Sequence, residues 1–354
     1  MRAIMIGFGT VGQGVCELLI RHRDRYAARL GEPIELAGIL VRDAAKPREV
    51  APPPGCVVTD DPHQLFTQPA DMLIEVAGGV DTALPHHARA LDAGLDIVTA
   101  NKALVAARGN QLFAHAERTH RRIGIEATVA GGVPILETIT TCLAANHITT
   151  VAGITNGTCH FIIRAMEQGR DYADALAEAH RIGFAEADPT LDVSGRDSVE
   201  KLAIMAALAF GGAVDVDAIP SRGVDQLTLE ELHDADEQGM AIRLLGLARR
   251  PDDPGAPVEL VNGPCLVPKD SPLGRCPADE MAVLVQGDAA PRMLIAGAGA
   301  GRFPTASAVV ADVLKLAQLR GAREGTLNPW PTESLSIAPA PAGDDAMPVV
   351  ASGG

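Results

Sequence analysis

One acidic segment carries the residue types best suited to proton transfer. Between residues 183 and 197, four carboxylates precede a predicted helix: Glu186, Asp188, Asp192 and Asp197. Asp197 and Lys201 are four residues apart, so they share one face of that helix. A partly buried lysine beside a carboxylate can exchange a proton with a hydroxyl or carbonyl oxygen. The spacing therefore predicts a catalytic pair, and the plainer alternative is a solvated acidic loop with an ordinary ion pair.

The same region offers groups that could hold an amino-acid substrate. Glu186 and Asp192 suit the ammonium group of such a substrate. A polar turn at residues 154–158 precedes another predicted helix, and its backbone N–H groups and the Thr158 hydroxyl could bind a carboxylate. The alternative is that this turn only caps its helix.

A glycine-rich turn near the N-terminus has the spacing of a dinucleotide site. Residues 7–12 fit GxGxxG, after a predicted strand and before a helical pattern. Gly7 would permit the tight turn, Gly9 would let the backbone approach a pyrophosphate, and Gly12 would let the helix pack closely. The helix N-terminus offers N–H groups and the positive dipole end to phosphates. The remaining positions of this predicted cofactor site are Phe8, Thr10 and Val11. The alternative interpretation is a glycine-rich turn that binds no ligand.

Two further predicted strands end in residues that suit the same cofactor. Arg42 follows one strand, and a guanidinium there can pair with the 2′-phosphate of NADP. In the alternative, Arg42 is a surface charge and Asp43 binds the ribose hydroxyls of NAD. Thr99 ends another strand and Lys102 follows it, at the edge where parallel sheets bind ligands. By position alone, Lys102 is equally well a surface lysine.

The elements that must position these residues alternate between strands and helices. Apolar runs predict strands at 3–6, 34–41, 72–76, 95–99 and 123–127, with a helix at 82–93. This alternation predicts an α/β fold with a Rossmann-type, doubly wound parallel sheet. Longer helical patterns follow at 134–143, 160–167, 172–181 and 198–209, with strand-like runs at 258–261 and 281–285 and a last helix at 305–319. They indicate a second, α+β domain.

Composition and charge exclude several classes of protein. The 354 residues suggest two or three domains. With 30 Lys and Arg against 45 Asp and Glu, the net charge of −15 argues against nucleic-acid and membrane-surface partners. No apolar run has membrane-spanning length, and the N-terminus lacks a signal-peptide layout. The six cysteines form no CxxC, so we expect reduced thiols in a cytoplasmic protein, with disulfides or a metal site as the alternative.

Together these segments resemble the homoserine dehydrogenase family over roughly residues 1–320. The matching segments are GFGTVGQGV at 7–15, VTANKALVA at 98–106, EATVAGGVPI at 126–135, GITNGT at 153–158, GFAEADPTLDVSGRDSVEKLAI at 183–204, LVPKDSPL at 266–273 and GAGAGRFPTASAVVAD at 297–312. The segment at 183–204 is the most specific, because ordinary Rossmann enzymes lack it.

The resemblance implies a reaction and roles for the residues above. Family members interconvert L-homoserine and L-aspartate 4-semialdehyde with NAD(P), on the route to threonine, isoleucine and methionine. Lys201 would donate the proton to the carbonyl oxygen, and Lys102 would contact the nicotinamide side and could share the proton chemistry. The groups that would bind or orient the substrate and Lys201 are Glu186, Asp192 and Asp197, with Thr158 at the pocket edge.

The resemblance also implies a cation site, a further cofactor contact and a homodimer. A sodium ion would bind backbone oxygens of Glu126, Val129, Gly131 and Val133. Gly299 and its neighbours would close over the cofactor, and dimer contacts would come from the second domain. We therefore expect a small-molecule substrate, NADP or NAD, and a second copy of the chain as partners.

The domain boundaries follow from the change of pattern near residue 130. We expect a dinucleotide-binding domain at 1–130 that is completed by about 304–330. A substrate-binding, catalytic and dimerisation domain would span 131–303, and a loose tail would span 331–354. The chain resembles a short form of the family, without an aspartokinase or a C-terminal regulatory domain.

Two departures from the family pattern keep alternatives open. Where members usually read NGTTNY, this chain reads NGTCHF, so His160 could alter the pocket wall. Ala298 and the pair Arg302-Phe303 replace the usual Pro and Gly-Leu near a cofactor contact. The alternatives are a related NAD(P) oxidoreductase on another amino-acid-derived alcohol or aldehyde, and a non-catalytic NADP-binding paralogue. A phosphorylating semialdehyde dehydrogenase is disfavoured, because neither Cys142 nor Cys159 lies in an evident nucleophile turn.

Overall fold

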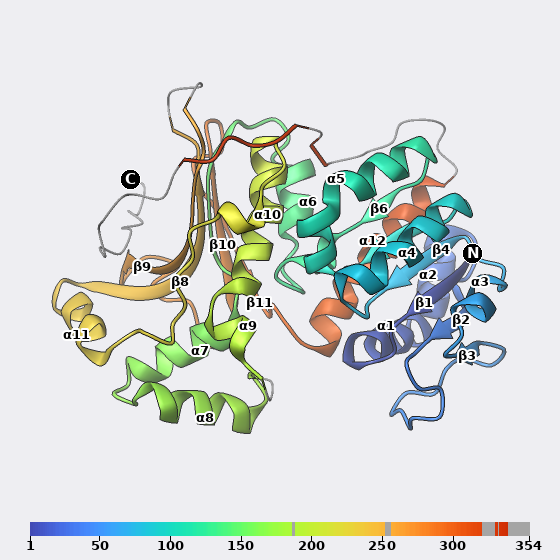
Figure 1. Ribbon diagram of the computed structural model, residues 1–354, viewed down its shortest axis with the longest axis horizontal. Helices are drawn as coiled ribbons and strands as arrows, with labels where there is room; N and C mark the ends of the chain where they lie inside the picture. The colour runs from blue at the N-terminus through green and yellow to red at the C-terminus, as the bar shows by residue number, and fades with distance from the viewer. Residues whose placement is uncertain (186–187, 252–255, 321–329, 332, 339–354) are drawn as a thin grey trace. The chain divides into compact units, whose positions relative to one another are not determined.

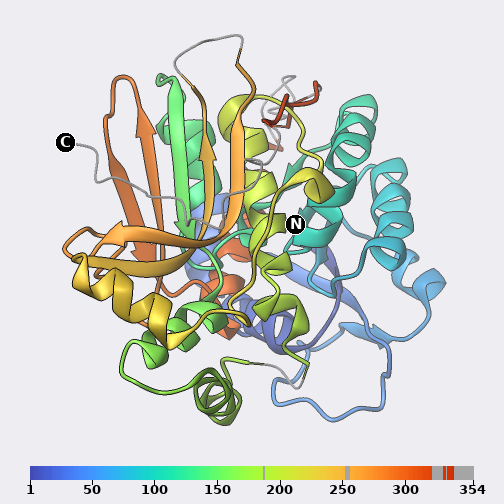
Figure 2. The same cartoon turned by 60° about the vertical axis from the view of Figure 1, so that its left-hand side comes forward.

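The computed structural model describes residues 1–185, 188–251, 256–320, 330–331 and 333–338 (Figure 1). The chain forms two compact units, one of Met1–Pro134 with Ala300–Thr332 and the other of Ile135–Gly299 with Glu333–Gly354. Each unit contains its own sheet, and the second sheet is seen more openly in Figure 2.

The first unit is built on a parallel sheet of six strands in the order β3-β2-β1-β4-β5-β6. The strands are β1 (Arg2–Ile6), β2 (Glu35–Leu40), β3 (Val57–Thr59), β4 (Met72–Glu75), β5 (Asp96–Thr99) and β6 (Ile123–Gly124). This is the strand order of a doubly wound dinucleotide-binding fold. All strands are parallel, and the chain adds strands on one side of β1 up to β3 and then on the other side from β4 onward. The predicted Rossmann-type sheet is confirmed, and its carboxyl edge beside β1 and β4 is the expected ligand crevice.

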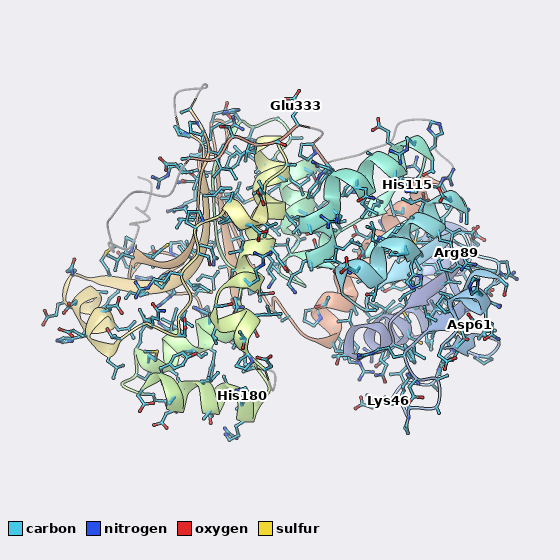
Figure 3. All side chains as sticks on the ribbon, in the orientation of Figure 1. Lys46, Asp61, Arg89, His115, His180 and Glu333 are labelled. Atoms are coloured by element: carbon cyan, nitrogen blue, oxygen red, sulfur yellow. The ribbon has the colours of Figure 1, made fainter. Side chains whose placement is uncertain are left out.

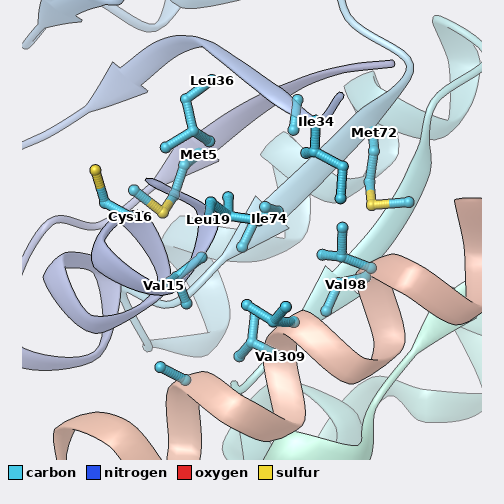
Figure 4. Close-up of a cluster of buried hydrophobic side chains, with 14 of the residues drawn as sticks. Met5, Val15, Cys16, Leu19, Ile34, Leu36, Met72, Ile74, Val98 and Val309 are labelled. Carbon is cyan, nitrogen blue, oxygen red and sulfur yellow. The ribbon is translucent and has the colours of Figure 1, made fainter. Parts of the chain in front are cut away.

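Helices complete the first unit. They are α1 (Thr10–Arg21), α2 (Arg23–Leu30), α3 (Pro62–Phe66), α4 (Val80–Asp92), α5 (Lys102–Arg118) and α12 (Arg302–Leu319). Although α12 is far away in sequence, it packs against α1, and its Val309 joins the core with Met5, Val15 and Val98 (Figure 4). Aliphatic packing dominates this core, as a chain with only 3% aromatic residues requires.

The second unit contains an antiparallel sheet of five strands in the order β11-β10-β7-β8-β9. Its strands are β7 (Ile148–Ile154), β8 (Met240–Arg249), β9 (Glu259–Pro268), β10 (Met281–Gly287) and β11 (Met293–Gly297). Its helices are α6 (Ile135–Glu137), η2 (Thr138–Cys142), α7 (Gly157–Met166), α8 (Tyr172–Ile182), α9 (Thr190–Val193), α10 (Arg196–Phe210), η3 (Val216–Ala218) and α11 (Leu229–Glu237). The buried helix α10 packs against β7, β8 and β9, so the mixed α+β prediction is confirmed.

Several local predictions differ from the structure. The strand predicted at 123–127 ends at Gly124, and the short helix η1 (Glu126–Thr128) follows. There the Glu126 N–H donates to Asp312 Oδ2 at 2.8 Å and the Thr128 hydroxyl to the Ile125 carbonyl at 2.6 Å. These bonds take the backbone groups that a strand would pair across the sheet. The helix predicted at 134–143 is divided into α6 and the π-helical η2.

The surface carries charged side chains, and the C-terminal segment forms short bridges with the second unit. Charged side chains such as Lys46, Asp61 and Glu333 are exposed (Figure 3). Short β-bridges join Ser334 to Ala213 and Ile337 to Val258, and residues 339–354 of the predicted loose tail lie outside the described residues. Among the described residues, no helix combines the length and the apolar character needed to cross a bilayer.

Candidate active site

Helix α10 holds Lys201 inside a polar cluster of the second unit. The Lys201 Nζ donates to Asp197 Oδ2 at 2.8 Å and to the Thr155 carbonyl oxygen at 2.6 Å. The residue is only 8% exposed, which shields the ammonium from bulk water. Asp197 and Lys201 thus meet on one face of α10, as their spacing predicts. The Thr155 acceptor comes from the turn between β7 and α7 and was not anticipated.

Asn156 links the two carboxylates of this cluster. Its Nδ2 donates to Asp192 Oδ1 and to Asp197 Oδ2, both at 3.0 Å. Its Oδ1 accepts the Cys159 N–H at 2.8 Å and so caps α7. Two neighbouring carboxylates repel each other, and a shared amide donor offsets that repulsion. Asn156 was not among the predicted site residues; its only signal was its place in the polar turn at 154–158, ahead of a predicted helix.

Asp192 and Thr158 lie in the same cluster. The Thr158 hydroxyl donates to the Phe184 carbonyl at 2.8 Å and has a longer contact of 3.4 Å with Asp192 Oδ2. Burial and, after it, the charge of Asp197 raise the pKa of the Asp192 carboxyl. A cationic ligand would reverse this effect, because it would favour the ionised carboxylate. Glu186, the other carboxylate expected to bind substrate, lies outside the described residues.

Cys159 and His160 on α7 have contacts that suit structural roles, and the Cys159 thiol does not suit a nucleophile. The Cys159 Sγ lies 3.1 Å from the Asp192 carbonyl, and burial raises the pKa of this thiol well above its usual value. His160 instead contacts the Pro277 and Cys276 carbonyls, with its Nε2 at 2.9 and 3.2 Å. Burial lowers the pKa of His160 to about 4, so the imidazole is neutral near pH 7. His160 is therefore bonded to the 276–277 segment rather than to the carboxylate cluster.

The glycine turn of the first unit has the shape that a pyrophosphate requires. Gly7 has a φ of 97°, and a Cβ there would lie 2.8 Å from the Ala77 nitrogen. A Cβ on Gly12 would lie 2.3 Å from the Gly7 carbonyl oxygen, so α1 needs glycine for its close approach. Gly9 precedes α1 without a capping side chain, and a Cβ there would meet no atom within 4 Å. This open N-terminus fits the phosphates of a dinucleotide.

Two arginines stand near the cofactor turn. Arg42 is exposed two residues after the end of β2, where a 2′-phosphate would be recognised. The guanidinium carbon of Arg48 lies 5.8 Å from the centroid of the Phe8 ring, and its Nη2 donates to the Asp43 carbonyl at 2.7 Å. Arg48 was not among the predicted site residues, because only the folded loop brings it to Phe8.

The other predicted cofactor residues of the first unit lie at the carboxyl end of β5. Thr99 is fully buried, and its hydroxyl donates to Glu75 Oε2 at 2.8 Å, so this hydroxyl is used inside the protein. Lys102 is the first residue of α5, and the Asn101 side chain caps that helix by accepting the Leu104 N–H at 3.1 Å. The structure thus places Lys102 at the ligand-binding edge of the sheet.

The remaining predicted site residues lie in a bend and before α12. Ala130 and Gly131 have φ values of 52° and 47°, which make a tight bend of buried backbone around Val129 and Val133. Among the described residues, no group of His, Cys, Asp or Glu side chains is arranged to hold a metal ion. Gly299 packs directly on Met281, since a Cβ there would lie 2.0 Å from the Met281 sulfur.

Comparisons with known proteins agree with this geometry. Residues 134–314 match the family model described as homoserine dehydrogenase, and residues 7–126 match the model of the homoserine dehydrogenase NAD binding domain. The chain is 39% identical to the homoserine dehydrogenase of Corynebacterium glutamicum over 318 residues, which are 89% of this chain and 71% of that protein. It is 41% identical to that of Pseudomonas aeruginosa over 310 residues, 87% of this chain and 70% of that protein.

A solved structure is similarly close. The homoserine dehydrogenase of Thiobacillus denitrificans matches with a TM-score of 0.90 and 38% identity, covering 96% of this chain and 79% of that chain. The expected family, fold and class of enzyme are therefore confirmed. This chain belongs to the homoserine dehydrogenase family of NAD(P)-dependent oxidoreductases.

Proposed function

We propose that this chain interconverts L-homoserine and L-aspartate 4-semialdehyde with NADP and that Lys201 moves the proton. The observation that carries this assignment is the Lys201 ammonium, held between Asp197 and the Thr155 carbonyl in a buried cluster. An ammonium has three donors, and these two are its acceptors among the described residues. A substrate oxygen would be the third acceptor, which suits a proton donor to a carbonyl.

The chain's own residues would divide the work as follows. The nicotinamide cofactor, when bound, supplies or accepts the hydride. Lys201 donates its proton as negative charge grows on the carbonyl oxygen, and Asp197 holds the ammonium in place. Asp192 and Glu186 would bind the substrate ammonium, and Thr158 would lie at the edge of the pocket. The positive charge of that ammonium would offset the electrostatic repulsion between the Asp192 and Asp197 carboxylates.

The cofactor would be held by the turn Gly7–Gly12 together with Arg42, Thr99 and Lys102. The open N-terminus of α1, with Phe8, Gly9, Thr10 and Val11, supports pyrophosphate binding. The exposed Arg42 supports NADP over NAD, because a guanidinium matches a phosphate with two hydrogen bonds. Lys102, which could share the proton chemistry, would contact the nicotinamide side, and Gly299 would contribute from the far end of the chain.

Four further features belong to the same proposal. Backbone oxygens of the 126–133 bend, those of Glu126, Val129, Gly131 and Val133, would hold a sodium ion. The second unit would form a homodimer. A cytoplasmic location is supported by the six cysteines, all of which are free thiols. In domain terms, residues 1–130 with about 304–330 would bind the cofactor, 131–303 would bind substrate, and 331–354 would be a tail.

The test follows the absorbance of the reduced cofactor with purified protein. NADPH should be consumed with L-aspartate 4-semialdehyde and NADP reduced with L-homoserine, while other hydroxy-amino acids react far more slowly. Turnover of a different hydroxy-amino acid in preference to homoserine would indicate the related oxidoreductase instead. Cofactor binding without turnover of any of these substrates would indicate a non-catalytic paralogue.

A further inference from the structure

Glu75 is a carboxylate buried completely at the carboxyl end of β4. Its Oε1 accepts the backbone N–H groups of Ala77 and Gly78, at 2.8 and 2.9 Å. Its Oε2 accepts the Thr99 hydroxyl at 2.8 Å and lies 3.3 Å from the Nε2 of buried His87 on α4. One side chain thus accepts hydrogen bonds from the segment after β4 and from the end of β5, and it lies beside a residue of α4.

The segment held by Glu75 lies directly against the glycine turn. The Ala77 nitrogen, whose N–H Glu75 accepts, would be 2.8 Å from a Cβ on Gly7, and the Val76 carbonyl oxygen would be 2.9 Å from it. Val76 also donates its N–H to the Ile6 carbonyl at 2.9 Å. The position of the Ala77 peptide therefore sets the wall against which the Gly7 turn is formed.

A second chain of contacts leads from Glu75 to the start of α5. The Thr99 oxygen that donates to Glu75 also accepts the Asn101 N–H at 3.0 Å. The Asn101 side chain donates to the Gly79 carbonyl at 2.8 Å and caps α5, whose first residue is Lys102. Glu75 is thus connected to two predicted cofactor-binding segments of the first unit: to the Gly7 turn through the packed 76–77 peptide, and to the start of α5 through hydrogen bonds.

We propose that Glu75 is a positioning residue of the cofactor site, which fixes residues 76–79 against the Gly7 turn and holds Thr99 so that α5 presents Lys102 to the nicotinamide side. This inference rests on the proposed use of the Gly7 turn and Lys102 for cofactor binding. Glu75 itself touches neither substrate nor cofactor in this role.

The chemistry of the carboxylate suits that role. An ionised acceptor makes stronger hydrogen bonds to backbone N–H groups than a neutral one does. Burial works against the charged form, but His87, the Gly78 amide and the Thr99 hydroxyl outweigh it and keep the pKa of Glu75 below its ordinary value. Glutamine in its place keeps the shape but supplies one acceptor oxygen instead of two, so it tests the charge and the second oxygen without opening a cavity.

Asp96 provides a matched control in the same sheet. It is 2% exposed and begins β5, at the amino end of the neighbouring strand. Its Oδ1 accepts the Arg122 N–H at 2.9 Å, away from the carboxyl edge that binds ligands. Asp96→Asn therefore also removes a buried charge from the sheet, at the edge where no cofactor contact is expected.

The experiment compares Glu75→Gln, Glu75→Ala and Asp96→Asn in the full chain. The Kd for NADPH is measured by titration of nicotinamide fluorescence, and amide hydrogen exchange of residues 76–79 is measured without cofactor. We expect Glu75→Gln to raise the Kd roughly tenfold and Glu75→Ala to raise it more, because buried donors lose a charged acceptor. Exchange at residues 76–79 should accelerate in both, the KM for the semialdehyde should stay within about twofold, and Asp96→Asn should keep the wild-type Kd.

Other outcomes would overturn the inference. If Glu75→Gln keeps the wild-type Kd while its melting temperature falls as in Asp96→Asn, the carboxylate is only structural. If the Kd rises equally in Asp96→Asn, the effect is general loosening of the sheet. Glu75→Gln decides the matter if Glu75→Ala does not fold. The Kd is measured without turnover, so a wild-type chain that binds NADPH but leaves homoserine unreacted would contradict the proposed function and not this inference.

Discussion

The Lys201 Nζ and the Asp197 Oδ2 lie 2.8 Å apart on successive turns of α10, and both side chains are largely buried. Because one rigid helix carries both residues, the carboxylate holds the direction of the ammonium before any substrate binds. A donor that is already oriented stabilises charge that appears only in the transition state. The pair is thus better suited to proton donation than a surface ion pair, whose partners reorient freely.

Asn156 should matter for turnover beyond its role as a helix cap. Asn156→Ala removes both donors from Asp192 and Asp197, so we expect kcat to fall at least tenfold. Asn156→Ser is the matched variant, because serine can still cap α7 but its single hydroxyl proton cannot bridge two carboxylates. Steady-state kinetics should show the loss in both variants, whereas only the alanine variant should lose about 1 kcal/mol of unfolding free energy. A serine variant with wild-type kcat would contradict the bridging role.

Arg42 should discriminate between the two nicotinamide cofactors. Arg42→Ala removes the guanidinium proposed to bind the 2′-phosphate, so the KM for NADPH should rise roughly tenfold and that for NADH should stay the same. Arg25→Ala, at an exposed position on α2 of the same unit, is the control for loss of one positive charge and should change neither KM. Equal losses with NADPH and NADH in Arg42→Ala would remove the argument for phosphate recognition.

His160 should make the protein sensitive to acid. Its pKa is lowered in the folded state from 6.5 to about 4, so the unfolded chain binds the extra proton first as the pH falls. The linked stability is present above pH 6.5 and is lost as the pH falls from 6.5 toward 4, by about 2 kcal/mol at pH 4.5. Urea unfolding at pH 7 and at pH 4.5 measures this loss.

The matched variant for that measurement is His160→Gln, since glutamine can donate to the Pro277 or Cys276 carbonyl but does not titrate. The difference in unfolding free energy between the two pH values should be about 2 kcal/mol smaller in the variant. The same difference in both proteins would show that His160 is not the group responsible.

Much of the fold could be predicted from local patterns. The Gly7 turn, the apolar strands and the helix between β4 and β5 follow from periodicity and from glycine geometry, which depend on short stretches of chain. The strands β3, β7, β8 and β11 were missed. In β8, the apolar pattern is interrupted by Arg243, which is fully buried and paired with Glu167 at 2.6 Å. Only tertiary structure supplies the partner that permits such a charge in a strand.

In the candidate site too, contacts within one helix could be predicted from the sequence, whereas contacts between distant segments could not. Asp197 and Lys201 could be paired from sequence, because helical spacing alone brings them together. The hydrogen bonds from Asn156 to the two carboxylates and from Lys201 to the Thr155 carbonyl could not be predicted. They join residues more than 35 positions apart in the sequence. Glu75 gave no signal either, because a glutamate at the end of an apolar run reveals nothing about the amides it accepts.

The most direct test of the account is the turnover number of Lys201→Ala, measured in both directions with saturating homoserine or aspartate semialdehyde. Lys269→Ala is the control, since Lys269 is half-exposed and paired with Asp236 on the surface of the same unit. We predict that kcat falls by about 10²–10⁴ in Lys201→Ala, as expected for loss of a general acid, while Lys269→Ala keeps the wild-type value. A correctly folded Lys201→Ala protein whose kcat remains within about tenfold of wild type would contradict the role assigned to this lysine.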